Sequence, residues 1–174
     1  ELCFRCHGDT ASGNAVVNRQ FAELNTRLEF NAGNASFHPV EAIGKNPDVP
    51  SLIAPMTVNS KIQCTSCHNN NTGPGNGGTG PNGPHGSIYS PLLERQQRFT
   101  DGLAESLSNY ALCYKCHDRN SILNDRSFSE HRKHIVDERT ACTVCHDSHG
   151  VRTANHLINF DRNVVSPSSS GRLA

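Results

Sequence analysis

The chain carries four copies of one short pattern, in which two cysteines three positions apart are followed at once by a histidine. The four copies are Cys3, Cys6 and His7; Cys64, Cys67 and His68; Cys113, Cys116 and His117; and Cys142, Cys145 and His146. They contain all eight cysteines of the 174-residue chain. The spacing therefore points to a chemistry that uses two sulfurs and one imidazole together.

Three kinds of site use a C-x-x-C pair: a zinc site, a redox dithiol and a covalent haem anchor. Two cysteine pairs complete a tetrahedral zinc site, which makes no use of a histidine after each pair. A dithiol of the thioredoxin type occurs once, after a strand, and does not come in fours. C-x-x-C-H is the spacing of c-type haem attachment, and zinc is the weaker alternative.

A turn of helix explains why haem attachment needs this spacing. Residues i and i+3 lie on one helical face, so both cysteines can form thioethers to the two vinyl groups of a haem. The histidine at i+4 projects from the same face and reaches the iron. The sequence therefore predicts four covalently bound haem c groups, whose proximal iron ligands are His7, His68, His117 and His146.

The opposite side of each iron also needs a ligand. The only methionine, Met56, fills at most one position, and its apolar setting favours packing on a haem face. Two imidazoles on every iron are therefore expected, because histidines are in surplus. Six histidines lie outside the motifs: His38, His85, His131, His134, His149 and His156.

An internal duplication helps to choose among them. Residues of about 1–93 and 103–160 form two dihaem repeats within a single tetrahaem domain spanning 1–174. Each repeat has a motif, a histidine two residues before a valine, a second motif and a His-Gly pair. Alignment of the repeats matches His38 with His134 and His85 with His149. The predicted distal ligands are these four histidines.

The histidines of the second repeat raise two further points. His149 follows His146 by only three residues, so it must cap a neighbouring haem, which predicts two closely spaced porphyrins. His131 stands three residues before His134 on one face of an expected short helix and is an alternative ligand. His156 has no counterpart in the duplication and is expected to be solvated or to bind a propionate.

The composition favours a fold built around cofactors. Tryptophan is absent, aromatic residues make up 6% of the chain, and there are 14 glycines and 9 prolines. Too few large apolar side chains are present to offset chain entropy, so bound porphyrins would supply the core. We expect a mostly coil fold with a few short α-helices and little or no β-sheet, wrapped around a chain of haems. The apoprotein is expected to be largely disordered.

Local patterns predict few regular elements. An apolar stripe over residues 15–30, made of Val17, Phe21, Leu24 and Leu28, predicts a helix that packs on a haem face. A second helix is expected over 103–117, and shorter helical turns should carry the other motifs. Residues 31–63 and 69–86 are expected to be loops. Residues 161–174 are expected to form a C-terminal tail.

The motif order resembles a known family. Paired C-x-x-C-H motifs that end in "CHDSHG" resemble the doubled-motif multihaem cytochromes of metal-reducing bacteria. Across nearly the whole chain, the arrangement is similar to their outer-surface tetrahaem cytochromes, some of which polymerise into extracellular nanowires. The resemblance implies bis-histidine low-spin haems, a mostly coil fold and export.

Charge and chain ends bear on partners and location. Sixteen basic and sixteen acidic residues balance, which argues against nucleic-acid binding. No apolar run is long enough to span a bilayer. Because the chain begins at Glu1, it is expected to be a processed product or a fragment without its signal peptide. An extracellular or cell-surface location is expected, with the periplasm as the alternative.

The predicted function is electron transfer rather than enzymatic catalysis, because two imidazoles leave an iron no open position. We expect a subunit of a polymeric extracellular filament whose partners are other copies of the chain, other redox cytochromes or extracellular acceptors. A soluble periplasmic shuttle is the alternative, and a multihaem reductase is the weaker one.

One haem ligand is predicted to be supplied in trans across the joint between subunits. His38 is the candidate, since it lies on a proline-bearing segment without a haem anchor. The open alternative is that this segment folds back, so that His38 caps a haem of its own chain.

Overall fold

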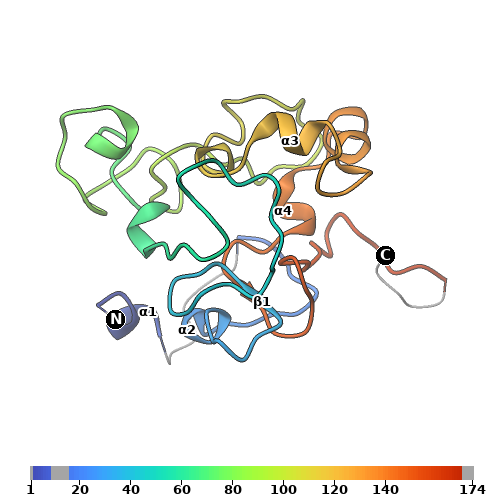
Figure 1. The fold of residues 1–174 in the computed structure, drawn as a ribbon, viewed down its shortest axis with the longest axis horizontal. Coiled ribbons are helices and arrows are strands. Elements are labelled where there is room, and N and C mark those ends of the chain that lie inside the picture. Colours follow the sequence, from blue (N-terminus) through green and yellow to red (C-terminus); the bar gives the residue numbers. More distant parts are fainter. Residues whose placement is uncertain (1, 9–15, 170–174) are drawn as a thin grey trace.

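Segments without regular structure dominate the computed structural model, which describes residues 2–8 and 16–169 (Figure 1). Its α-helices are α1 (Phe4–His7), α2 (Thr26–Glu29), α3 (Arg119–Leu123) and α4 (Cys142–Cys145). Its other helical elements are the 3-10 turns η1 (Cys64–Ser66), η2 (Pro74–Asn76) and η3 (Cys113–Lys115) and the π-helix η4 (Lys133–Asp137). The prediction of a mostly coil fold with a few short helices is confirmed.

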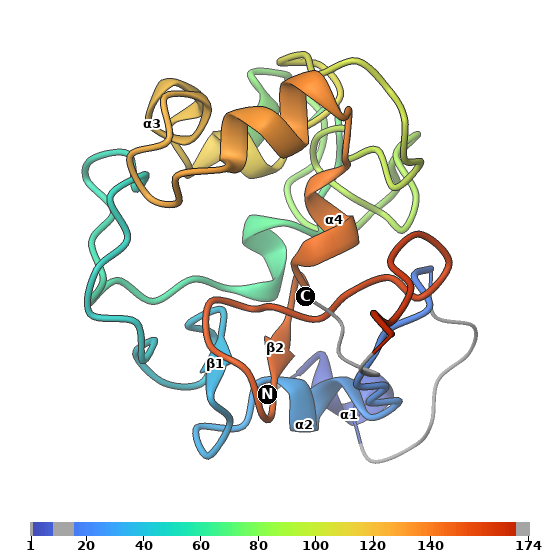
Figure 2. The same cartoon turned by 90° about the vertical axis from the view of Figure 1, so that its right-hand side faces the viewer.

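The sheet of the described chain is small and joins its two halves. Strands β1 (Ser36–Phe37) and β2 (Gly150–Val151) pair antiparallel and lie side by side in Figure 2. Directly after β1, the backbone N–H of His38 donates to the carbonyl of His149 at 2.8 Å. The sheet therefore brings two predicted iron ligands together from positions far apart in the sequence.

All four C-x-x-C-H motifs lie on short helical turns, as predicted for the first, second and fourth, whereas the third was expected to end a longer helix. In each motif the backbone N–H of the histidine donates to the carbonyl of the first cysteine, which closes one turn. The N···O distances are 2.9 Å for His7, 2.8 Å for His68, 3.0 Å for His117 and 3.0 Å for His146. This geometry places both sulfurs and the imidazole of a motif on one side of the turn.

The predicted helix over 15–30 is wrong except for α2. The backbone N–H of Gln20 donates to the carbonyl of Phe160, and that of Phe21 donates to Asn159 Oδ1, both at 2.9 Å. These bonds to a distant segment replace the i to i−4 bonds that a helix needs. Of the predicted stripe, Val17 is buried but Phe21 is exposed. Residue 15 lies outside the described residues.

The predicted helix over 103–117 is also wrong, and only η3 forms there. The segment crosses residues 96–98 and bonds to them. Leu112 N–H donates to the carbonyl of Gln96 at 3.0 Å, and Arg98 N–H donates to that of Asn109 at 2.8 Å. Tertiary pairing therefore decides the backbone conformation, as it does in the segment before α2.

The main apolar cluster lies between the third and fourth motifs. It consists of the buried side chains of Tyr110, Tyr114, Ala141 and Val144. The two tyrosine rings meet edge to face, with centroids 6.4 Å apart. The cluster fixes η3 against α4, and so it holds two motifs of the second half at a set separation.

The tail predicted to begin at residue 161 begins later. Asp161 is buried and forms an antiparallel bridge with Arg19. The next residue, Arg162, donates its N–H to the carbonyl of Asn18 at 2.8 Å, and Val165 packs against the tyrosine cluster. Residues 161–165 are therefore part of the fold.

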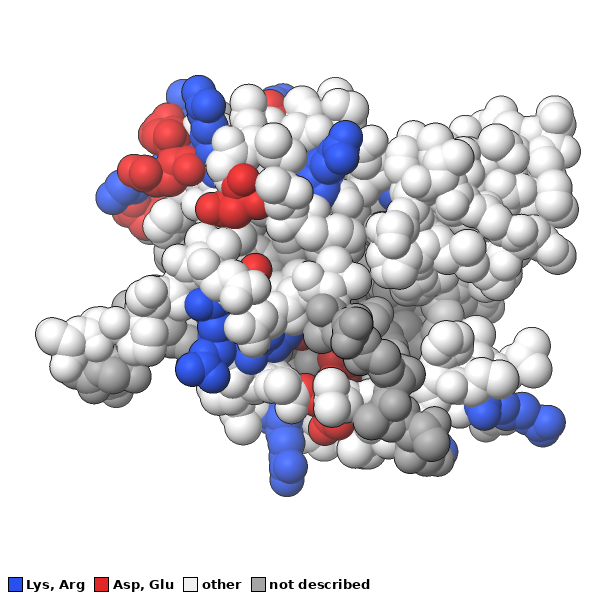
Figure 3. All heavy atoms as spheres, turned by 180° about the vertical axis from the view of Figure 1, so that it is seen from behind, with Lys and Arg blue, Asp and Glu red and all other residues white. Residues whose placement is uncertain are grey.

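The predicted loop over 69–86 belongs to a lobe that carries no charged side chain. Residues 69–93 contain no Asp, Glu, Lys or Arg. In Figure 1 they form the green lobe that stands off to one side, and the corresponding region of Figure 3 is uncharged. Across the described chain, the helices are all too short or too polar to cross a membrane.

Candidate functional site

Two histidines from different halves face each other across a gap. The ring centroids of His68 and His149 are 6.3 Å apart, with an interplanar angle of 38°. His68 closes the turn of η1, and His149 immediately precedes β2. The short link after His146 therefore places His149 opposite the histidine of another motif, as its length requires.

A second pair has the same separation. The ring centroids of His131 and His146 are 6.3 Å apart, with an interplanar angle of 49°. The sequence alignment had favoured His134 as a distal ligand in this region. His134 is instead exposed, and its ring stacks on Phe128 at 6.1 Å. The structure thus places His131, the alternative, opposite a motif histidine.

This separation suits a metal ion between the rings. With a metal–nitrogen bond of about 2 Å on each side, and a centroid about 1.1 Å beyond each nitrogen, the centroids would lie about 6.2 Å apart. Aromatic rings in direct contact have centroids in the same range, about 4.5–7 Å apart. The two separations are therefore compatible with a metal ion between the imidazoles and do not require one.

The Nδ1 atoms of six candidate iron ligands are already engaged in hydrogen bonds, which leaves Nε2 as the nitrogen that can bind a metal. A ligating imidazole usually donates its other N–H to a protein acceptor, and this fixes both tautomer and orientation. The Nδ1 partners are the Ser148 carbonyl for His38 (2.7 Å), the Pro91 carbonyl for His68 (3.0 Å), Ser51 Oγ for His117 (3.0 Å), Ser127 Oγ for His131 (3.1 Å), the His156 carbonyl for His146 (2.9 Å) and Glu29 Oε2 for His149 (2.8 Å).

Two motif histidines are held in the neutral form that metal binding requires. Desolvation lowers the pKa of His117 to about 4, and the nearby imidazoles of His38 and His146 contribute. Desolvation also lowers the pKa of His146 to about 4, against the raising effect of its hydrogen bond to the His156 carbonyl. The imidazole of His38 therefore lies near the third and fourth motifs of the same chain.

The cysteines of successive motifs lie next to one another. Desolvation, and then Cys3, raise the pKa of Cys64, so the first and second motifs are neighbours. A hydrogen bond with Cys142, and then desolvation, raise the pKa of Cys113, which makes the third and fourth motifs neighbours.

Lys115 connects the second motif to the third. Its Nζ donates to the carbonyl of Ser66 at 2.7 Å and pairs with buried Glu94 at 2.5 Å. Taken with the neighbouring cysteines, this contact places the four motifs side by side in the order of the sequence.

The sulfurs do not gather as a zinc site would require. Within the described chain, the one group of three or more possible ligand atoms lying within 4.8 Å of one another is Glu29, Asp147 and His149. None of the eight cysteines forms a disulfide. Pairs of neighbouring sulfurs therefore exist without the fourfold convergence of a tetrahedral site.

Four of the predicted ligands form no ring pair within residues 2–8 and 16–169: His7, His38, His85 and His117. The side chains of His7 and His85 are both exposed. The pKa of His68 is lowered by desolvation and, to a smaller extent, by His149 and His7, so His7 lies near the second motif. His85 lies on the uncharged lobe. His156 is exposed with Nδ1 2.9 Å from Asn46 Nδ2, in line with the expectation that it is solvated.

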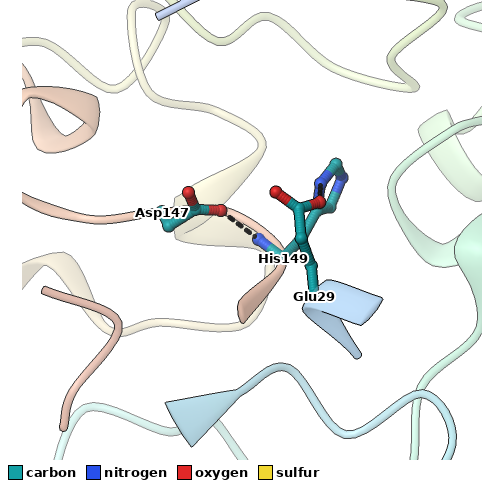
Figure 4. A group of neighbouring side chains, drawn as sticks. All are labelled: Glu29, Asp147 and His149. Atoms are coloured by element: carbon teal, nitrogen blue, oxygen red, sulfur yellow. Dashed lines mark hydrogen bonds and ion pairs between the residues drawn. The ribbon is translucent and has the colours of Figure 1, made fainter. Parts of the chain in front are cut away.

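Glu29 is a site residue that the sequence did not reveal. Figure 4 shows its carboxylate against the ring of His149, with Asp147 on the other side. Asp147 accepts the backbone N–H of His149 at 2.9 Å and pairs with Arg19 at 3.3 Å. Residues 29 and 149 are far apart in the chain, and no local pattern links them.

Searches of family models, curated proteins and solved structures returned nothing that matches this chain.

Proposed function

We propose that this chain is an electron-transfer protein that holds four covalently attached haem c groups in a row. The proposal rests on the two pairs of facing imidazoles, His68 with His149 and His146 with His131, whose spacing suits one iron each. Their engaged Nδ1 atoms support it, because they leave Nε2 of each ring as the nitrogen that can bind a metal.

The placement of the side chains refines the ligand assignment. We assign His149 to the iron of the second motif and His131 to that of the fourth. His38 is assigned to the third motif by elimination, because its imidazole lies near both His117 and His146, and His146 already faces His131. His38 therefore acts within its own chain, which is the alternative left open by the sequence.

The arrangement of side chains supports electron transfer as the proposed function. When bound, each haem supplies a reversible one-electron couple between ferric and ferrous iron. Two imidazoles per iron leave no position for a substrate, and the Nδ1 bonds hold the rings in place in both oxidation states. The contacts between neighbouring motifs bring the attachment points close together, as efficient transfer along a row requires.

The first motif supports the proposal of a homopolymer. It lies on exposed α1, and within the described chain His7 forms no ring pair with another imidazole. His85 is exposed on the uncharged lobe, where no charge repulsion opposes a second copy. We assign His85 as the ligand supplied in trans, in an extracellular or cell-surface filament.

The exposure of His7 also favours a second candidate function. If no other copy supplies a ligand to the first motif, the iron held by His7 keeps an open position, and the protein is a multihaem reductase or a periplasmic shuttle. A high-spin band that persists in the assembled protein would indicate the reductase. Filaments whose haems are all low-spin would indicate the conducting polymer.

The test is to produce the chain with a c-type cytochrome maturation system. We expect a mass increase of four haems, a low-spin spectrum, and filaments by electron microscopy. His85→Ala should abolish the filaments and leave a monomer with one altered haem, while His134→Ala should assemble normally. A chain that leaves the maturation system without covalent haem would refute the proposal.

A further inference from the structure

The hydrogen bond between His149 and Glu29 sets one ligand pair apart from the others. The Nδ1 of His149 lies 2.8 Å from Glu29 Oε2. In the other five candidate ligands, Nδ1 bonds to a neutral oxygen, either a backbone carbonyl or a serine hydroxyl. Within the described chain, His149 is therefore the candidate ligand whose Nδ1 bonds to a carboxylate.

The surrounding structure holds this contact in place. Glu29 ends α2, and its side chain is only 13% exposed. A Cβ on Gly150 would lie 1.8 Å from the Glu29 carbonyl oxygen, so the missing side chain lets β2 approach α2. Phe30 packs its ring against that of His149 with centroids 5.2 Å apart. The carboxylate and the imidazole are therefore set by the fold rather than by a flexible surface contact.

A carboxylate acceptor changes what an imidazole does to a metal. It draws the Nδ1 proton toward itself, which makes Nε2 a stronger electron donor. A stronger donor stabilises ferric iron more than ferrous iron and so lowers the reduction potential. The negative charge of Glu29 acts in the same direction, because it lies in a partly desolvated setting close to the iron. The charge of nearby Asp147 is offset by Arg19.

We propose that Glu29 is a positioning residue that gives the iron between His68 and His149 the lowest potential of the four. This inference rests on the proposed function. Because the second motif lies between the first and the third, the lowest potential would fall inside the row and not at either end. Electron transfer onto this haem from a neighbouring haem would then be thermodynamically unfavourable within each subunit.

The experiment is a spectroelectrochemical titration of the holoprotein and of Glu29→Gln. The glutamine keeps an acceptor oxygen and removes the charge. We expect the lowest of the four midpoint potentials to rise while the other three stay in place. The matched control is Glu41→Gln, which removes an exposed carboxylate of equal charge from the loop after β1 and should leave all four potentials unchanged. Superimposable curves for wild type and Glu29→Gln would overturn the inference.

A second variant guards against a misfolded product. Glu29→Asp keeps the charge but withdraws the carboxylate by one methylene, so it should raise the same potential by less. Electron paramagnetic resonance should show altered g values for one low-spin haem in both variants and for none in Glu41→Gln. If four haems are attached but neither variant changes the potentials or the g values, this inference alone fails. If no haem is attached, the proposed function fails.

Discussion

The two halves of the molecule hold their motifs in different ways. In the second half, η3 and α4 flank a cluster of Tyr110, Tyr114, Ala141 and Val144, and three of these side chains are no more than 1% exposed. In the first half, neither α1 nor η1 contains a buried residue. Packed protein thus fixes the second pair of motifs, and the first pair has no such support from its own helical turns.

The two halves contact each other through histidines that we propose as iron ligands. His149 of the second half faces His68 of the first, and His38 of the first half lies near His117 of the second. The β1–β2 pair connects the two exchanged histidines through their backbones. We therefore expect the first half to depend both on the proposed cofactors and on its contacts with the second half.

The largest expected effect comes from removing the cofactors altogether. A chain in which serine replaces all eight cysteines cannot form thioethers. No haem then occupies the space between the paired imidazoles. We expect loss of cooperative unfolding, with rapid proteolysis of residues 16–93 and slower cleavage around the tyrosine cluster. Limited proteolysis read by mass spectrometry measures this order. Equal resistance of both halves to the protease would contradict the proposed difference between them.

The next effect tests the exchange of ligands. His149→Ala should convert one of four haems to high spin, and the affected haem should be the one attached at Cys64 and Cys67. His131→Ala should do the same at the fourth motif. The measurement is the absorption and magnetic resonance of the ferric holoprotein.

The matched control for the ligand variants is His134→Ala, which removes an imidazole from the same helical segment. It should leave all four haems low-spin, because the His134 ring stacks on Phe128 instead of facing a motif. If His134→Ala produces a high-spin haem and His131→Ala does not, the alignment of the repeats chose the distal ligand correctly.

The motifs themselves could be predicted because their geometry is local. A cysteine, a second cysteine three residues on and a histidine after it set one helical turn wherever they stand. The distal positions are different, since His131 and His134 share one helical face and only the alignment of the repeats, which favoured His134, distinguishes them. Their choice depends on Ser127, which fixes the His131 ring, and on Phe128, which covers the ring of His134.

The two helices that failed to form share one physical cause. The prediction over 15–30 rested on apolar residues at helical spacing, which are also found where a coil packs on another segment. Arg19 lies in the first of these segments and is largely buried. Its guanidinium donates to the carbonyls of Thr143, His146 and Asn159 at 2.6–2.9 Å. Such long-range bonds are invisible to a local pattern and override it.

A smaller effect is expected from the core of the second half. Val144 is 1% exposed, so Val144→Ala should destabilise the holoprotein by about 2 kcal/mol through lost burial and an unfilled space. Val16→Ala is the control, because that side chain is 59% exposed in the first half. Denaturant titrations followed by the low-spin spectrum give both values. Equal destabilisation by the two variants would remove the distinction between the halves.

The smallest expected effect concerns an ion pair beside the same core. Glu105 is 5% exposed, pairs with Arg119 and accepts a hydrogen bond from Tyr114 Oη at 3.0 Å. The bond from Arg119 holds the pKa of Glu105 below its ordinary value of 4.5, against the opposing effect of desolvation. Glu105→Gln keeps an acceptor but loses the charge, so it should cost about 1–2 kcal/mol at neutral pH.

The pH dependence gives this last prediction its sign. A carboxylate whose pKa is lowered by folding contributes stability at pH values above its unfolded pKa. That contribution is lost as the pH falls through the folded pKa, where the native state takes up the proton. The stability difference between wild type and Glu105→Gln should therefore be constant near neutrality and shrink below about pH 4. For the control Glu41→Gln, the difference in stability from wild type should not change with pH. If the stability difference for Glu105→Gln persisted in acid, the shape of the Glu105 side chain and not its charge would support Tyr114.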